Sequence, residues 1–275
     1  MRETEPRPIH INKAQAVWRE TVRKILRYPL LKTQESADNL GGLERLCEFI
    51  AQGKGGIVVE THFSTSDPLW ALDSVMVNQA KDVKASAPIA KHHAFFGLLP
   101  FAKSIGVRAI KVTTPETKRL ADEKGENNLR RGNGTLEYMN EAAETVKDGG
   151  IVVIATNAHR KSQLTFDESG VVTRLIKGLH ERGISLSDAW IHFVSFEMNG
   201  IQDYENKKVR GLNFFKKHKV NHGETLTVSE LLLKAGIEIK ESETRDEWKE
   251  RALGSIENAV YNRFVNIVPT AYLPR

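Results

Sequence analysis

Length, composition and charge exclude several classes of protein at the outset. The chain has 275 residues, of which 40% are hydrophobic and 27% charged. This is the composition of an ordinary globular protein that is long enough for one large α/β domain. A formal net charge of +5 is modest for a nucleic-acid-binding protein, and no zinc-finger or RNA-binding signature accompanies it. The longest apolar stretch, from Ala94 to Ala102, falls well short of the roughly 18 residues that a membrane-spanning helix needs.

The single cysteine and the polar N-terminus indicate a cellular compartment. One cysteine, Cys47, excludes an internal disulfide and favours a reducing environment. It shares a helical face with Leu43, Leu46 and Ile50, which predicts a buried packing residue rather than a nucleophile. The first residues are polar and lack the apolar core of a signal peptide. We therefore expect a cytoplasmic protein, either free or peripheral on the inner face of the membrane.

Two amphipathic helices are expected before the first long apolar run. The first spans residues 12 to 27 and is stopped by Pro29. We expect its apolar face to pack on the core; that face consists of Val17, Trp18, Val22 and Ile25. The second helix runs from about Gly42 to Gln52, with Gly53 as its C-terminal cap. We expect residues 1–50 to form a small helical N-terminal subdomain and residues 51–275 to form the α/β domain.

Strand and helix patterns alternate through the rest of the chain. Strands are predicted at about 56–61, 87–91, 108–113, 150–155 and 189–196. The helices between them include a polar surface helix within 113–134 and a helix over 135–147. Capping-box patterns predict two later helix starts, at Thr227 with Glu230 and at Thr244 with Glu247. This alternation predicts an α/β fold with a mostly parallel central sheet flanked by helices.

The first predicted strand of this sheet leads to a pair of residues suited to acid–base chemistry. The apolar run from Gly56 to Val59 predicts a buried strand, His62 follows it, and Asp67 stands five positions later. Asp67 and Pro68 suit the N-cap and the first position of a helix, so His62 and Asp67 can meet across one tight turn. Asp67 would then accept from one imidazole nitrogen while the other takes a proton from a substrate hydroxyl. The alternative is a surface histidine beside an aspartate that only caps a helix, because the His-x4-Asp pattern alone is weak.

With the segments downstream of it, this pair resembles the glycerolipid acyltransferases, which esterify glycerol 3-phosphate and lysophosphatidate from acyl thioesters. His62 and Asp67 match the family's first block, an Asn-His-x4-Asp-like motif, with Thr61 where Asn is usual. The second block is similar to residues 95–112, where Val112 stands in place of the family's arginine. The resemblance covers roughly residues 55 to 200.

The third and fourth blocks refine the resemblance. The predicted strand 151–154 leads into a segment where Arg160 matches the family's arginine and Asn157 replaces its glutamate. The soluble plastid-type glycerol-3-phosphate acyltransferases also lack that glutamate and keep the arginine, so the third block is nearer to them. The fourth block corresponds to residues 190–196, without the family's usual proline.

The resemblance implies a reaction and a role for each matched residue. His62 would be the general base for the acceptor hydroxyl, oriented by Asp67. A thioester is already activated, so no metal, cofactor or covalent enzyme intermediate is required, and acyl-coenzyme A or acyl carrier protein would be the co-substrate. Arg160 would hold the acceptor phosphate in a bidentate way, and Asn157 would hydrogen-bond an acceptor hydroxyl. The supporting cations would be Lys161, Lys111 and Lys91; for these lysines, as for Arg160, the alternative is an ordinary solvated side chain.

Two basic segments leave alternatives open. Residues 207–219 frame Phe214 and Phe215 with cations, which suits an anionic membrane surface or an acidic carrier protein. The alternative, which we expect, is an exposed loop with both rings tucked into the core. The basic helix 12–27 has the same two interpretations, and core packing of its apolar face is again expected.

The sequence offers little support for other chemistry. It contains no nucleophile elbow, P-loop or dinucleotide-binding motif. Its histidines at 92, 93 and 159 match no common metal-ligand spacing, so no metal site is expected. We therefore expect an O-acyltransferase that acts on glycerol 3-phosphate or a lysophospholipid. The alternatives are a non-catalytic lipid-binding relative and, less favoured, a basic protein that binds nucleic acid.

Overall fold

The computed structural model describes most of the α/β core. The described residues are 10–33, 40–61, 75, 83–90, 98–104, 106–113, 115–125, 134–156, 164, 170–198, 218–270 and 273. Statements about the structure refer to these residues.

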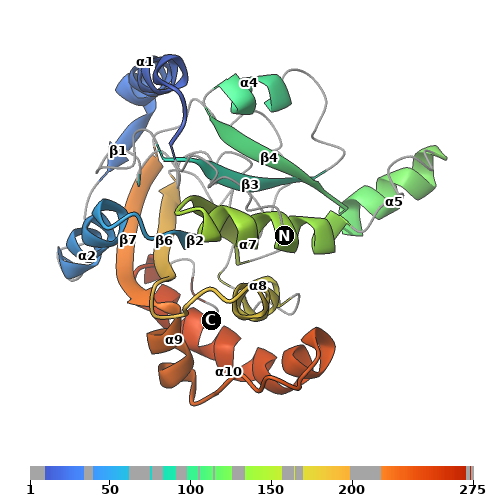
Figure 1. The fold of residues 1–275 in the computed structure, drawn as a ribbon. Coiled ribbons are helices and arrows are strands. Elements are labelled where there is room, and N and C mark those ends of the chain that lie inside the picture. The colour runs from blue at the N-terminus through green and yellow to red at the C-terminus, as the bar shows by residue number, and fades with distance from the viewer. Residues whose placement is uncertain are drawn as a thin grey trace, which may run out of the picture.

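The centre of the molecule is one seven-stranded sheet with the order β1-β7-β6-β2-β5-β3-β4 (Figure 1). Five neighbouring strands, β6, β2, β5, β3 and β4, run parallel; β7 is antiparallel to β6, and β1 is parallel to β7. The strands are β1 Leu31–Thr33, β2 Gly56–Glu60, β3 Ala85–Ala90, β4 Val107–Val112, β5 Ile151–Ala155, β6 Trp190–Met198 and β7 His218–Thr227. The predicted α/β class with a mostly parallel sheet is confirmed.

Burial along the strands follows their position in the sheet. Every residue of the central strand β2 is buried, as the continuous apolar run predicts for a strand covered on both faces. On the edge strand β4, Val107 and Ile110 are buried while Arg108 and Lys111 are exposed, so this edge is covered less completely than the centre of the sheet. The five predicted strands all exist, with ends that differ from the prediction by at most two residues.

Helices cover both faces of the sheet. Phe193 of β6 packs edge-on against Phe264 of a C-terminal helix, with ring centroids 5.6 Å apart. The adjacent residue, His192, binds Thr225, whose hydroxyl donates to the carbonyl of Gly42 in an N-terminal helix. Successive side chains on a strand point to opposite faces, so these two helices lie on opposite sides of the sheet.

The helices of the described chain have the following bounds. They are α1 Lys13–Leu30, α2 Leu40–Ala51, α4 Leu98–Ser104, α5 Pro115–Lys124, α7 Gly134–Lys147, α8 Val171–Glu181, α9 Val228–Ala235 and α10 Arg245–Val265. α7 packs on β3, β4 and β5, and α8 packs between α7 and α10 (Figure 1). None of these helices is both long and apolar enough to cross a bilayer.

The first fifty residues contribute directly to the sheet. β1 pairs with β7, and α2 packs on β6 and β7. α2 ends as predicted at Gly53, which has a φ of 72°, and Cys47 on this helix is half-buried rather than fully buried. The division of the chain at residue 50 stays a prediction.

The first helix differs from its prediction in length and in orientation. α1 continues through Pro29 to Leu30 because a proline in the last turn removes only one helical hydrogen bond. Its predicted core face is also wrong: Val17 is 68% and Trp18 45% exposed, although Val22 packs on the core. Arg19 is buried instead, and its guanidinium donates to the carbonyl oxygen of Val83 at 2.8 Å.

Both capping boxes that the sequence predicts are present. The Thr227 side chain accepts from the backbone N–H of Glu230, and the Glu230 carboxylate accepts from the N–H of Thr227. Thr244 and Glu247 make the same reciprocal pair at the start of α10. Each pair satisfies two of the backbone donors that a helix start leaves without partners, which fixes where α9 and α10 begin.

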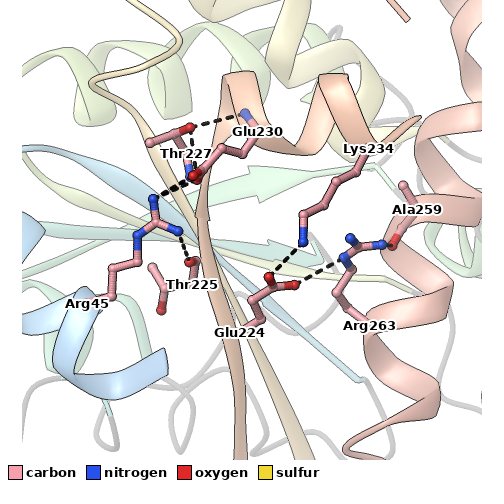
Figure 2. Close-up of polar contacts among 8 residues, drawn as sticks. All are labelled: Arg45, Glu224, Thr225, Thr227, Glu230, Lys234, Ala259 and Arg263. Carbon is pink, nitrogen blue, oxygen red and sulfur yellow. Dashed lines mark hydrogen bonds and ion pairs between the residues drawn. The ribbon is translucent and has the colours of Figure 1, made fainter. Parts of the chain in front are cut away.

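Ion pairs hold the second half of β7, a strand that the sequence did not predict (Figure 2). One guanidinium nitrogen of Arg45 in α2 donates to both carboxylate oxygens of Glu230 in α9, each at 2.8 Å. On β7 itself, Glu224 accepts from Lys234 of α9 at 2.8 Å and lies 3.4 Å from Arg263 of α10. Arg45 also donates to the β7 carbonyl of Thr225 at 3.1 Å, so these contacts connect the antiparallel strand to α2, α9 and α10.

The packing of β2 against β6 generates a stability prediction. A Cβ added to Gly56 would lie 2.0 Å from the indole of Trp190, which is fully buried and anchored by donation to the Lys54 carbonyl at 2.8 Å. Gly56→Ala should therefore lower the free energy of unfolding by roughly 1–3 kcal/mol through overpacking. Urea unfolding followed by circular dichroism measures this change.

The matched control is Gly254→Ala in α10, where a new Cβ would meet no atom within 4 Å. This variant should stabilise the protein by about 0.5–1 kcal/mol, because alanine favours a helix interior over glycine. Equal stabilities of Gly56→Ala and wild type would contradict the described contact between Gly56 and Trp190.

Candidate functional site

The candidate site lies at the carboxyl ends of the central parallel strands, where β2 and β5 finish side by side. Glu60 of β2 is in register with Ala155 of β5 on one side and with Val194 of β6 on the other. From β2 the chain proceeds to β3, toward one edge of the sheet, whereas from β5 it proceeds to β6, toward the other. Connections that leave neighbouring strands in opposite directions define a topological switch point, the usual position of ligand sites in open α/β sheets.

Hydrogen bonds continue the register beyond the last paired residues. The backbone N–H of Thr156 donates to the carbonyl of Glu60 at 2.9 Å, and its hydroxyl donates to the same oxygen at 3.1 Å. On the other side, the N–H of Thr61 donates to Val194 at 3.1 Å, and its hydroxyl accepts from the N–H of Phe196 at 3.3 Å. Thr61 and Thr156 are both buried, so the two strand ends are firmly fixed relative to each other.

A buried acid lies directly below this edge. Glu60 is fully buried, and its charge acts on Tyr138 of α7, whose hydroxyl donates to the carbonyl of Val153 at 3.1 Å. Burial raises the pKa of the Tyr138 hydroxyl well above its ordinary value, and the Glu60 carboxylate raises it further. Tyr138 therefore stays protonated and acts as a hydrogen-bond donor at any physiological pH. The sequence signal for Glu60 was an acid at the end of an otherwise apolar run.

Most of the predicted site residues lie outside the described part of the chain. These are His62, Asp67, Lys91, Asn157, Arg160 and Lys161. The structure does place the residues that precede two of the family-like blocks: Thr61 comes directly before His62, and Thr156 directly before Asn157. The strand ends that lead into the first and third blocks are therefore neighbours. The predicted roles of the six residues stay predictions.

Lys111 is the predicted site residue that falls within the described part of the chain. It is exposed on β4, one residue before the strand ends at Val112. In the sheet order β4 is separated from β2 by β5 and β3, which corresponds to about 14 Å at the usual strand spacing. Val112, which stands where the family has arginine, is half-buried and packs against the core. The role of Lys111 toward phosphate stays a prediction.

Sequence reasoning missed a buried chain of polar side chains between β6 and β7. His192 Nδ1 lies 2.8 Å from the Thr225 hydroxyl, and His192 Nε2 lies 3.0 Å from His222 Nδ1. The Thr225 hydroxyl already donates to the Gly42 carbonyl, so His192 must donate from Nδ1 and accept at Nε2, and His222 must donate from Nδ1. The hydrogen bonds thus all point in one direction and require the His192 imidazole, which accepts at Nε2, to be neutral.

Burial lowers the pKa of both histidines. It lowers the pKa of His222 to about 4. Burial, followed by the charge of His222, holds the pKa of His192 well below its usual value of 6.5. The pair therefore contributes hydrogen bonds without charge near neutral pH, and it connects β6, β7 and α2.

A hollow of about 970 Å³ lies at the opposite, amino-terminal ends of β3 and β4. Charged groups of both signs line it, but several are already engaged. Arg108 forms an ion pair with Glu141, and Glu144 with Arg182. The mixed charges provide no concentrated field for an anionic substrate, so this hollow is a weaker candidate than the carboxyl edge.

No protein-family model and no curated protein matches the chain. Among the described side chains, no group of three histidine, cysteine, aspartate or glutamate residues is arranged to hold a metal ion. The function is therefore inferred from the site and from the sequence blocks that adjoin it.

The buried histidine pair predicts a loss of stability on acidification. Folding depresses the pKa values of His192 and His222 below 6.5, that of His222 to about 4. Their contribution is complete above pH 6.5 and is lost as the pH falls toward 4, because the unfolded chain binds protons that the folded chain does not. The slope should reach about 1.4 kcal/mol per pH unit for each histidine. Urea unfolding at a series of pH values measures the slope of the unfolding free energy against pH.

His222→Asn isolates this effect, because an asparagine amide can replace the donor at Nδ1 but does not titrate. The variant should show a shallower pH dependence than wild type between pH 6.5 and 4, whatever its stability at pH 7. Parallel curves for the two proteins would show that His222 is not buried in its neutral form.

Proposed function

We propose that the protein is an O-acyltransferase that moves a fatty acyl group from a thioester to a hydroxyl of glycerol 3-phosphate or a lysophospholipid. The observation that carries the proposal is the adjacency of β2 and β5 at the switch point of the sheet. The chain continues from β2 into the His-x4-Asp block and from β5 into the block that contains Arg160. The segments that contain the proposed base and the proposed phosphate-binding cation thus follow adjacent strands in the sequence.

The proposed chemistry uses both blocks in one step. His62, oriented by Asp67, takes the proton from the acceptor hydroxyl as its oxygen attacks the thioester carbonyl carbon. The carbon–sulfur bond breaks as the tetrahedral intermediate collapses, and the imidazolium returns the proton to the departing thiolate. Arg160 binds the acceptor phosphate, and Asn157 accepts from or donates to an acceptor hydroxyl. Lys161, Lys91 and Lys111 add positive charge around the acceptor.

The proposal also specifies the acyl donor and the cellular compartment. Acyl-coenzyme A or acyl carrier protein is the donor, and no metal or cofactor takes part. The single cysteine fits the reducing cytoplasm, and a lysophospholipid acceptor would require contact with the inner face of the membrane. A lipid-binding protein without catalysis is the alternative that the following experiments separate from an enzyme.

Replacing either member of the proposed dyad should abolish transfer without unfolding the protein. His62→Ala removes the base, and Asp67→Asn removes the charge that stabilises the imidazolium, so kcat should fall by roughly 10²–10⁴. Transfer of a labelled acyl chain from acyl-coenzyme A or acyl carrier protein to glycerol 3-phosphate measures it. His10→Ala, at an exposed residue beside the other end of the sheet, should be unaffected. A fully active His62→Ala variant would refute the assigned base, and an inactive wild type that still binds lipid would favour the non-catalytic alternative.

We expect Arg160 to bind the acceptor phosphate. A cation that contacts phosphate in both ground and transition states mainly affects KM. Arg160→Ala should therefore raise KM for glycerol 3-phosphate by about tenfold to a hundredfold, and Arg160→Lys should recover only part of this loss. Steady-state kinetics on phosphorylated and dephosphorylated acceptors measure the difference.

Arg119→Ala is the control for this series, because Arg119 is an exposed arginine that pairs with Glu123 on the surface helix α5. It should leave KM unchanged. If Arg160→Ala weakens both acceptors equally, then Arg160 does not recognise phosphate and a neutral acceptor becomes the better assignment.

A further inference from the structure

The outward face of α1 carries an unusual combination of side chains. Positions 13, 14, 17, 18, 21 and 24 repeat every three or four residues and so lie along one side of the helix. All six are exposed, and they are Lys13, Ala14, Val17, Trp18, Thr21 and Lys24. We call these six residues the α1 face. Its large apolar side chains are Val17 and Trp18, which are adjacent and are 68% and 45% exposed.

Val17 and Trp18 face outward because other residues of α1 make the contacts with the core. Arg19 occupies the inner side of α1, where it is buried and donates to Val83, and Val22 packs on the core. The Trp18 indole N–H donates to the Ser104 hydroxyl of α4 at 2.9 Å, which fixes the ring while leaving nearly half of it in solvent. Trp18 is therefore held in an exposed position by specific contacts.

The charge of the α1 face is positive. It contains Lys13 and Lys24; the half-buried Glu20 borders it and lies 3.7 Å from Lys24, so the two lysines outnumber the one acidic residue. Lys103 of α4 adds another exposed cation where Gln15 of α1 donates to its carbonyl. Apolar and aromatic side chains flanked by lysines are the composition of helices that lie in the interface of an anionic bilayer.

We propose that the α1 face docks the protein on the surface of an anionic membrane. An aromatic ring and an aliphatic side chain would enter the boundary between headgroups and acyl chains, and the lysines would contact lipid phosphates. The charge complementarity favours a bilayer with anionic lipids over a neutral one. Figure 1 shows α1 at the periphery of the molecule, where it contacts α4.

The two ends of α1 lie near opposite ends of the sheet. Its first half lies beside Ser104 and Val83, at the amino-terminal ends of β4 and β3. The whole helix, with 18 residues at 1.5 Å each, is about 27 Å long, and it leads into Leu31 of β1. Leu31 is in register with His218, which pairs with Met198 beyond the carboxyl edge of the parallel strands. Because Trp18 of the α1 face contacts Ser104, this face lies nearest the amino-terminal ends of β3 and β4, and docking through it does not depend on the proposed function.

Vesicle binding tests the proposal without relying on activity. The full chain is sedimented with vesicles of phosphatidylcholine alone and with vesicles containing 30–40 mol% phosphatidylglycerol (roughly −30 to −50 mV at the surface). Wild type should bind the anionic vesicles and lose this binding at high salt, because surface electrostatic attraction is screened. Val17→Gln and Trp18→Gln should each weaken binding, Trp18→Gln by roughly tenfold. Replacing Lys13 and Lys24 by Gln should weaken it by about fivefold per lysine.

Matched controls come from other exposed helices. Leu233→Gln on α9, at a leucine that is 81% exposed, and Gln replacements of Lys118 and Lys124 on α5 should leave vesicle binding unchanged. Failure of wild type to bind anionic vesicles, equal binding to neutral vesicles, or equal weakening by the controls would overturn the proposal. Transfer to the water-soluble acceptor glycerol 3-phosphate should persist in Trp18→Gln and vanish in His62→Ala, so failure of docking and failure of the proposed enzyme are distinguishable.

Discussion

The arrangement of the molecule depends on the parallel pairing of β2 with β5 on one side and β6 on the other. The central strand is buried along its whole length, so its backbone groups must find partners within the sheet. The register continues to Thr61 and Thr156 through both main-chain and side-chain hydrogen bonds. This pairing fixes the relative position of the two strand ends from which the proposed catalytic and phosphate-binding blocks emerge.

Polar groups buried near the central strands further restrict how the strands can pair. The charge of Glu60 acts on the Tyr138 hydroxyl and helps keep it protonated, and the histidine pair links β6 to β7 and to α2. Buried polar groups are costly unless they find partners, so such a network favours one strand register over its alternatives. We infer that these contacts specify how the antiparallel β7 joins an otherwise parallel sheet.

Much of the fold could be predicted from local patterns, and the failures have physical causes. Apolar runs such as Ile151–Ile154 identified the core strands, and capping residues identified the starts of α9 and α10. β7 was missed because its residues, His218–Thr227, are largely polar and pair with a strand distant in sequence. The α1 prediction failed because the burial of Arg19 depends on the carbonyl of Val83, which no helical periodicity reveals. The contact of His192 with His222 likewise requires the pairing of two strands 30 residues apart.

The candidate site was predictable in its location more than in its detail. A histidine and an arginine that each follow a buried strand indicated the carboxyl edge, and the strand order places the ends of those two strands next to each other. The most direct test of this account is a crystal structure of the protein with glycerol 3-phosphate. We predict the phosphate at Arg160, between the carboxyl ends of β2 and β5, and an acceptor hydroxyl within about 3 Å of the His62 imidazole. Binding of the phosphate at the opposite end of the sheet, in the hollow near Lys84 and Lys103, would contradict it.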